Sequence, residues 1–365
     1  MKKTSNKKTR LIIALNIFLV LLNYTIVFIA KKYPYLIEKY YSRKLFYTIS
    51  KPLSFISNSF KFSLGEGLSF IMGAFLIILV IKSIYNLIKK EYSKTIVNLL
   101  IIVLFLVSIV TYYQLAWGLN NYRVSVEENF NLENEDINMQ DLAASYKYLV
   151  LESNNLKNRL LKNNNVGVSK EYIYKNVYKG FENLNDEYPF ISADKTIVKP
   201  LKISKIFSNS GYAGIFIPFL SEANINYMMP KFSTPFTASH EIAHKKGFAS
   251  EDSANFVGFL ACYSHSDNYF KYSAFHAMMN YVGNSLYQND KELYREIAAL
   301  RSQEVLEDIE TNIAFWEKHE KEKSKEVHNK INDSFLKANN QPQGLVTYSK
   351  VTELFVKAHK AGMFN

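Results

Sequence analysis

Residues 234–256, TPFTASHEIAHKKGFASEDSANF, decide how the second half of this chain folds. Pro235 suits the first position of a helix, because the amide hydrogen that it lacks would have no partner there, and Thr234 before it is a candidate cap. Gly247 favours the left-handed conformation in which helices commonly end. The stretch therefore predicts a helix of about three turns that begins at residue 234 or 235 and stops at the glycine.

Two histidines lie four residues apart on this predicted helix. His240 and His244 project from one face at this spacing, so both imidazoles can bind one metal ion. Glu241, next to the first histidine, is placed to act as a general base on water that the metal activates. Because a bare motif of this kind also arises by chance, the residues that flank it must support the interpretation.

A catalytic zinc site normally takes three protein ligands and keeps one position open, so a third ligand is needed. Ser250 is a typical cap for a second helix, whose first turn then contains Glu251 and Asp252. Either carboxylate can face the histidines. We favour Glu251, because Asn255 lies one turn further along the same face and can orient a ligating histidine. The alternative is that both acids only complement the helix dipole.

Three apolar stretches before residue 120 predict membrane-spanning helices, at residues 11–30, 67–88 and 96–119. A signal peptide is the alternative for the first, but this stretch is too long and no small-x-small cleavage site precedes Lys31. Residues 45–62 are too polar to span and predict a segment at the membrane surface.

The positions of lysine and arginine predict the orientation in the membrane by a narrow margin. Five basic residues precede the first span and four mark the turn between the second and third, but seven lie in the loop at 31–63. The density of basic residues is higher in the tail and in the tight turn, which favours a cytoplasmic location for both. The chain after Leu119 is then expected outside the cytoplasmic membrane.

The composition limits the classes of protein to consider. A hydrophobic content of 48%, with 15% aromatic residues in 365, excludes a disordered chain. The 44 basic and 33 acidic residues are scattered, so their net charge of +11 favours contact with membrane lipid over nucleic-acid binding. The single cysteine, Cys262, excludes an intrachain disulfide.

The pattern after the spans predicts a second domain. Helical periodicity marks residues 139–162 and 169–184, short β-prone runs within 197–230 favour a small, mostly antiparallel sheet, and the pattern is helical again from 235 onward. The expected fold is mainly α: a membrane region at 1–119 with three transmembrane helices, then an α+β domain at 120–365 with a small antiparallel sheet and a helical C-terminal part.

The histidine motif and the acids that follow it resemble the gluzincin metallopeptidases, in which the next helix supplies the third ligand. Metzincins are disfavoured, because their third histidine would fall at Ser250. Residues 211–262, the three spans, WGLNNYR after the third span and LVTYSKVTELF near the end are similar to an uncharacterised bacterial membrane family, domain of unknown function 3810. Ser253 stands where a second acidic residue is expected in that family, and if that acid were the ligand, this site would be impaired.

The resemblance implies a zincin-like domain and a membrane-anchored, Zn²⁺-dependent peptidase that cleaves peptide or protein substrates with Glu241 as base. Tyr272 and Tyr212, with His265 and His276, are candidate donors to the oxyanion. The β-prone run at 211–228 suggests an edge strand for an extended peptide. Two alternatives stay open: a hydrolase of cell-wall peptides or another envelope amide, and a non-catalytic membrane scaffold with a degenerate metal site. The oligomeric state is not predicted.

Overall fold

The computed structural model describes the chain except residues 1, 133, 164–166, 342–347 and 365. It divides into two compact units. The first comprises Met1–Arg123 with Pro218–Leu220, and the second comprises Val124–Ile217 with Ser221–Asn365. Each unit is described below by itself.

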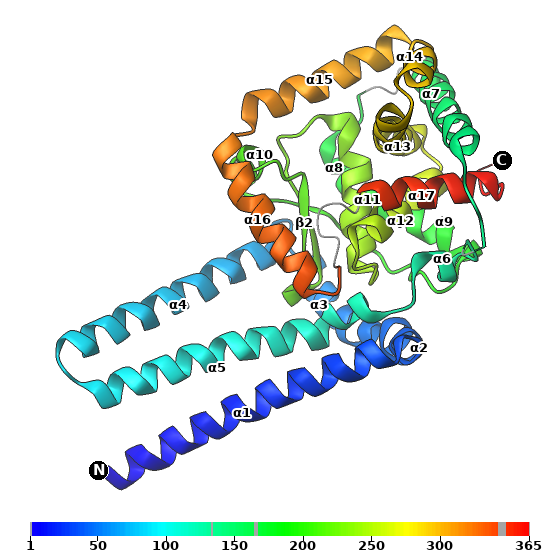
Figure 1. The fold of residues 1–365 in the computed structure, drawn as a ribbon. Coiled ribbons are helices and arrows are strands. Elements are labelled where there is room, and N and C mark those ends of the chain that lie inside the picture. The colour runs from blue at the N-terminus through cyan, green and yellow to red at the C-terminus, as the bar shows by residue number, and fades with distance from the viewer. Residues whose placement is uncertain (1, 133, 164–166, 342–347, 365) are drawn as a thin grey trace. The chain divides into compact units, whose positions relative to one another are not determined.

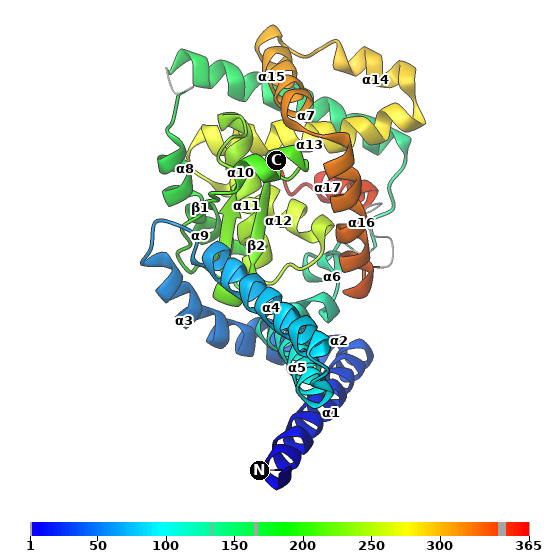
Figure 2. The same ribbon diagram turned by 90° about the vertical axis from the view of Figure 1, so that its left-hand side faces the viewer.

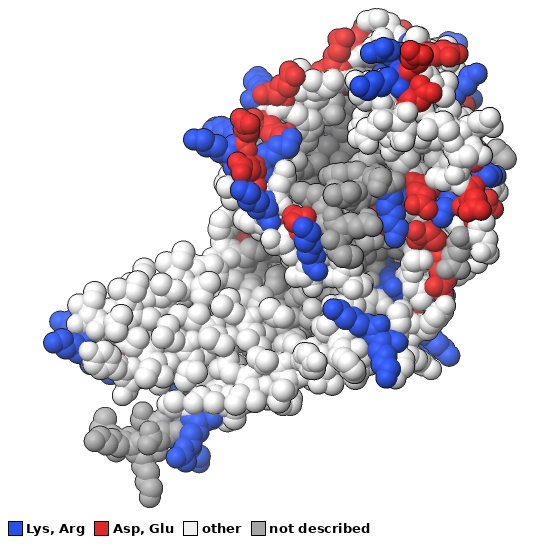
Figure 3. Space-filling model, in the orientation of Figure 1, with Lys and Arg blue, Asp and Glu red and all other residues white. Residues whose placement is uncertain are grey.

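Three helices of the first unit are long and apolar enough to cross a membrane: Lys7–Lys32 within α1 (Lys2–Lys32), α4 (Leu64–Ile88) and α5 (Tyr92–Ala116). This confirms the three predicted apolar helices. The third ends earlier than residue 119, because the chain leaves the helix at Trp117 and continues as a short helix, η2 (Gly118–Tyr122). The surface over α4 and α5 is almost free of charged side chains (Figure 3), as a lipid-facing surface requires.

Two hydrogen bonds connect the first and third of these apolar helices. The Asn23 side chain donates to Thr111 Oγ1 at 2.7 Å, and the Asn16 side chain donates to the Leu100 carbonyl at 3.2 Å, so both join α1 to α5. Bonds of this kind add to helix association where no hydrophobic effect drives it. The connection between α1 and α4 forms α2 (Pro34–Leu36), η1 (Ile37–Leu45) and α3 (Phe46–Asn58). That residues 45–62 lie at the membrane surface stays a prediction.

The second unit is mainly helical (Figure 1). Met139–Lys162 forms α7 with the predicted bounds, whereas the helix predicted at 169–184 is interrupted at Val177. There the Gly180 amide bonds the carbonyl three residues back, which tightens the turn. The helices are α6 (Val126–Asn129), α7, α8 (Lys170–Asn176), α9 (Tyr178–Glu187), α10 (Ser204–Asn209), α11 (Thr234–Lys245), α12 (Glu251–Ser264), α13 (Asn268–Asn289), α14 (Lys291–Ala298), α15 (Gln303–His319), α16 (Glu322–Ala338) and α17 (Tyr348–Lys360), with η4 (Lys231–Ser233) before α11.

The sheet of this unit is mixed rather than antiparallel. Its order is β1-β3-β2, with strands β1 (Lys199–Pro200), β2 (Gly214–Ile217) and β3 (Glu222–Ile225). Strand β2 pairs antiparallel with β3, as expected, but β1 pairs parallel with β3. The prediction was wrong for β1 because α10 and β2 intervene between β1 and β3 and return the chain in the same direction.

The core lies among α7, α11, α12 and α13. Of these helices, α11 packs on the sheet, beside β2 in Figure 2. Helix α12 is buried from Asp252 to Cys262 on all its faces, as expected of a helix at the centre of a domain. Its neighbours approach closely: a Cβ on Gly180 of α9 would lie 2.0 Å from the carbonyl oxygen of Ala261. This packing leaves the first turn of α12 against α11, where the histidines lie.

Candidate metal centre

Helix α11 carries both histidines and begins at Thr234 with Pro235 in its first turn. Thr234 is not the cap that the sequence predicts. The residues before it already form η4, so the chain enters α11 from a helical turn, and the Thr234 hydroxyl donates to the carbonyl of Pro230. After α11 the chain reverses at Gly247, whose φ of +85° is the left-handed conformation predicted for it.

Helix α12 begins directly after this reversal. Ser250 occupies the cap position with extended backbone angles, as predicted, but its side chain makes no capping bond. Instead its hydroxyl lies 2.5 Å from that of Ser253. The turn brings the first residue of α12, Glu251, back to the face of α11 that bears the histidines.

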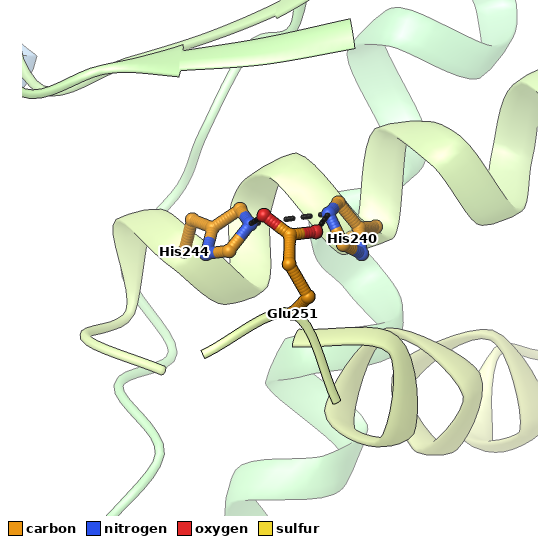
Figure 4. A group of neighbouring side chains, drawn as sticks. All are labelled: His240, His244 and Glu251. Carbon is orange, nitrogen blue, oxygen red and sulfur yellow. Dashed lines mark hydrogen bonds and ion pairs between the residues drawn. The ribbon is translucent and has the colours of Figure 1, made fainter. Parts of the chain in front are cut away.

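His240, His244 and Glu251 form one cluster (Figure 4), with ligand atoms that all lie within 4.8 Å of one another. The two Nε2 atoms are 3.1 Å apart. Glu251 Oε2 lies 3.3 Å from His240 Nε2, and Glu251 Oε1 lies 3.7 Å from His244 Nε2. The structure therefore brings together the three residues that the sequence proposes as metal ligands.

The other nitrogen of each ring is held by an acceptor. His240 Nδ1 lies 2.8 Å from Asn255 Oδ1, and His244 Nδ1 lies 2.9 Å from the carbonyl oxygen of Phe248. A carbonyl oxygen only accepts, so the proton of each ring is held on Nδ1 and the lone pair is on Nε2. Both lone pairs are thereby directed toward the shared space beside Glu251.

The spacing of these atoms fits a small divalent cation. Nitrogen ligands lie about 2.0–2.1 Å from zinc, so two ligands of a tetrahedral site are about 3.3 Å apart. The separations of 3.1 and 3.3 Å match this value, and that of 3.7 Å needs only a small side-chain adjustment. Two neutral imidazoles and a carboxylate also form a donor set that suits zinc.

A family model described as "Protein of unknown function (DUF3810)" matches residues 41–356, from η1 to α17. The chain belongs to this family. No curated protein and no solved structure matches it. The DUF3810 match contains the whole cluster, and because the family description assigns no activity, the chemistry must be argued from the site itself.

Glu241 of this DUF3810 protein is enclosed between α11 and β2. Its side chain accepts a hydrogen bond from the Phe216 amide, and the residue is 5% exposed. Gly214 leaves the space that it fills: a Cβ on Gly214 would lie 2.5 Å from Glu241 Oε1. Burial, with a contribution from Glu251, raises the pKa of Glu241 to about 8. The carboxyl group is therefore a stronger base than an exposed glutamate.

The protein groups alone give the three cluster residues different affinities for protons. Burial lowers the pKa of His240, but the Glu251 carboxylate outweighs it and raises this pKa to about 8. Burial and the neighbouring His240 lower the pKa of His244 to about 4. Burial raises the pKa of Glu251, but both histidines hold it well below its usual value. A proton and a metal ion would compete for the same lone pairs.

Asp252, the alternative third ligand, points elsewhere. It is 4% exposed and its carboxylate lies 3.8 Å from Lys350 Nζ, so it does not join the cluster. Asn255, in contrast, contacts His240 as the sequence predicts. Of the two acids, it is Glu251 that lies beside both histidines.

The candidate oxyanion donors have other contacts. Tyr272 is buried and its hydroxyl lies 2.5 Å from Asp308 Oδ2. His265 Nε2 bonds the carbonyl of Asn176, and the Tyr212 ring packs on Phe207. His276 Nε2 is buried without a hydrogen-bond partner among the described residues. Tyr272, His265 and His276 make no hydrogen bond or ion pair with the cluster in the described part of the chain.

Sequence reasoning missed several groups that complete the centre. The hydroxyl of Tyr281 on α13 lies 3.5 Å from Asn255 Oδ1, the same atom that His240 contacts. Phe248 and Phe216 act through backbone atoms, and Gly214 acts by having no side chain. A contact through the backbone does not depend on the residue type, so the sequence does not reveal the roles of Phe248 and Phe216. Of these three residues, the glycine is the one whose role the sequence could have suggested.

Proposed function

We propose that this protein is a membrane-anchored, zinc-dependent hydrolase that cleaves amide bonds in peptides. The observation that carries the proposal is the convergence of two Nε2 lone pairs and one carboxylate, with both Nδ1 atoms fixed by acceptors. The two Nε2 lone pairs point at each other across 3.1 Å, and this arrangement is not stabilising unless a cation or a proton lies between them.

His240, His244 and Glu251 would hold the ion, which leaves one tetrahedral position open. A zinc ion supplies a Lewis acid that polarises a carbonyl and lowers the pKa of water. Glu241 follows His240 and interacts electrostatically with His240 and Glu251 without being one of the three ligands, and its raised pKa suits a group that would accept a proton from water and pass it to the leaving amine. The hydrogen bond from Phe216 holds the carboxylate in place.

Strand β2 supports a peptide as substrate. It lies at the edge of the sheet, and the Asn226 amide bonds the Ala213 carbonyl at its start. Bonded pairs alternate along an antiparallel ladder, so the backbone groups of Gly214 and Phe216 turn away from β3, toward Glu241. An extended peptide laid along this edge would bring its amide bonds beside the base.

The first experiment measures metal in the purified full-length protein together with hydrolysis of peptide pools. We expect about one zinc per chain, lost in His240→Ala. Glu241→Gln should keep the zinc and lose turnover by several orders of magnitude, because the base is removed while the ligands stay. Protein without stoichiometric metal in either form would refute the proposal.

The same variant separates the alternatives. A non-catalytic scaffold would show no hydrolysis and no difference between wild type and Glu241→Gln, whereas a hydrolase of envelope amides would cleave cell-wall fragments and leave proteins intact. Cleavage of both unmodified peptides and proteins would support the peptidase. Each outcome assigns the site to one class.

A further inference from the structure

A second cluster of polar side chains lies inside the helical unit and shares no residue with the metal centre. Lys157 of α7 forms an ion pair with Asp308 of α15, and the Tyr272 hydroxyl on α13 lies 2.5 Å from the same carboxylate oxygen. The Lys157 ammonium is also 5.3 Å from the centre of the Tyr272 ring. One carboxylate therefore joins three helices.

Helices α7 and α13 pack antiparallel beside this pair. Lys157 contacts Tyr272 at one level, and Tyr146, earlier on α7, contacts Gly283, later on α13, where a Cβ would lie 2.7 Å from the tyrosine ring. The order of contacts along one helix is thus reversed along the other. This register fixes which residues meet between the two levels.

Ser153 and His276 lie at the intermediate level of the two helices. Ser153 is four residues before Lys157, and His276 is four residues after Tyr272, so each lies one turn from the ion pair and in the same direction. Arg301 reaches the same region from the segment after α14: Asn154 bonds the backbone on both sides of it, at Leu300 and Ser302.

Three buried atoms here have no hydrogen-bond partner among the described residues: Ser153 Oγ, His276 Nε2 and Arg301 Nε. Ser153 is 0% exposed and His276 is 3% exposed, so bulk water does not satisfy them. An unsatisfied buried polar group is costly, so three of them at neighbouring positions are best accounted for by a polar partner that binds between them.

The charges of the region favour a negative guest. Lys157 is paired with Asp308 and also interacts with the exposed carboxylate of Glu304, whereas Arg301 forms no ion pair in the described part of the chain. The Arg301 guanidinium donates to the hydroxyls of Tyr146 and Tyr294. A water molecule could satisfy a donor but would leave the Arg301 guanidinium without a counter-charge.

We propose that Ser153, Lys157, His276 and Arg301 form an interhelix site that binds a small oxyanion, through a phosphate or carboxylate group. Such a group accepts several hydrogen bonds at once and neutralises the charge of Arg301, whose guanidinium suits it by geometry. The side chains of Lys157 and Asp308 are each 15% exposed, so the site opens to solvent at this end.

Calorimetric titration of the full-length protein in detergent tests the site, with phosphate, sulfate and acetate as probes and chloride to hold ionic strength constant. We expect at least one probe to bind with a Kd below about 1 mM. Arg301→Gln should weaken it at least ~10-fold by removing charge-assisted bonds, and Ser153→Ala by a few-fold. Arg295→Gln, on the exposed surface of α14, is the matched control and should bind as the wild type does.

The preference among probes separates the two sources of the group: phosphate and sulfate above acetate indicates a phosphate-bearing ligand, and the reverse order a carboxylate. Binding of none of the three, or equal binding by the Arg301→Gln and Arg295→Gln variants, would overturn the proposal. If Arg301→Gln fails to fold, Ser153→Ala decides, because the hydroxyl that it removes has no hydrogen-bond partner among the described residues.

Discussion

Asn255 fixes the ring of His240 through the contact of its Oδ1 with Nδ1, at 2.8 Å. Asn255→Ala should lower zinc affinity about 10- to 100-fold, because the ring loses its orientation and its tautomer. Competition with a chelator would measure the change. Asn255→Asp keeps the acceptor and should stay near wild type, as should Asn289→Ala on the exposed end of α13. Unchanged affinity in Asn255→Ala would show that packing alone holds the ring.

Gly214 is required by the space that Glu241 occupies. In Gly214→Ala the new Cβ would meet Glu241 Oε1 at 2.5 Å and the Asn224 carbonyl at 2.9 Å. We expect a loss of about 1–3 kcal/mol of stability and of most turnover, with zinc retained. Thermal unfolding and metal content measure these separately. Gly167→Ala, with no atom within 4 Å of its Cβ, is the control, and equal effects of both changes would contradict the argument.

The end of α11 is held by a buried ion cluster. Asp194 Oδ2 lies 3.3 Å from Lys245 Nζ, and Asp194 Oδ1 lies 2.5 Å from Lys246 Nζ. Asp194→Asn leaves two buried ammonium groups without a counter-charge, so we expect a loss on the order of 3–5 kcal/mol. Asp186→Asn, on the exposed face of α9, should change little. Chemical unfolding at pH 7 measures both.

The same residue predicts a pH dependence. Burial raises the pKa of Asp194, but Lys246 and Lys245 outweigh it and hold this pKa far below its usual value of 3.8. A lowered pKa stabilises the fold above the unfolded-state pKa, and this contribution is lost as the pH falls through 3.8 toward the folded-state pKa. The difference between wild type and Asp194→Asn should therefore be full at pH 7 and shrink below about pH 4. A constant difference would mean that the charge is not responsible.

The sequence predicted helices correctly where a single feature, a regular apolar face or a long apolar run, was strong. Residues 139–162 have a regular apolar face and form α7 with those bounds, and the three spans are set by length and hydropathy. The pairing of the strands could not be predicted, because β1 has two residues and its sequence does not indicate which strand it pairs with. The cap at Thr234 was wrong for a similar reason: η4 before it depends on tertiary contacts.

The cluster was accessible from sequence because all its side chains lie on two adjacent helices joined by a glycine turn. Helical spacing aligned His240 with His244, and the turn at Gly247 returned Glu251 to the same face. Tyr281 could not, since it comes from α13 and its approach to Asn255 depends on the packing of the whole core.

At the scale of the molecule, the orientation in the membrane is a prediction from charge. The native Cys262 is 1% exposed, so it should not react with a maleimide reagent. A cysteine in place of Lys291, in the second unit, should react with a membrane-impermeant maleimide in intact cells. A cysteine in place of Lys90, in the turn between α4 and α5, should react only after permeabilisation. The opposite pattern would place the metal centre in the cytoplasm.

The turn at Gly247 has a consequence for biosynthesis. The three candidate ligands lie between residues 240 and 251, so the loop that joins them is short and its closure costs little entropy. Strand β2, which holds Glu241, also precedes them in the chain. A chain synthesised up to the end of α12 therefore already contains all three candidate ligands and β2, and under the proposed function their closure around an ion would not have to wait for α13 to α17.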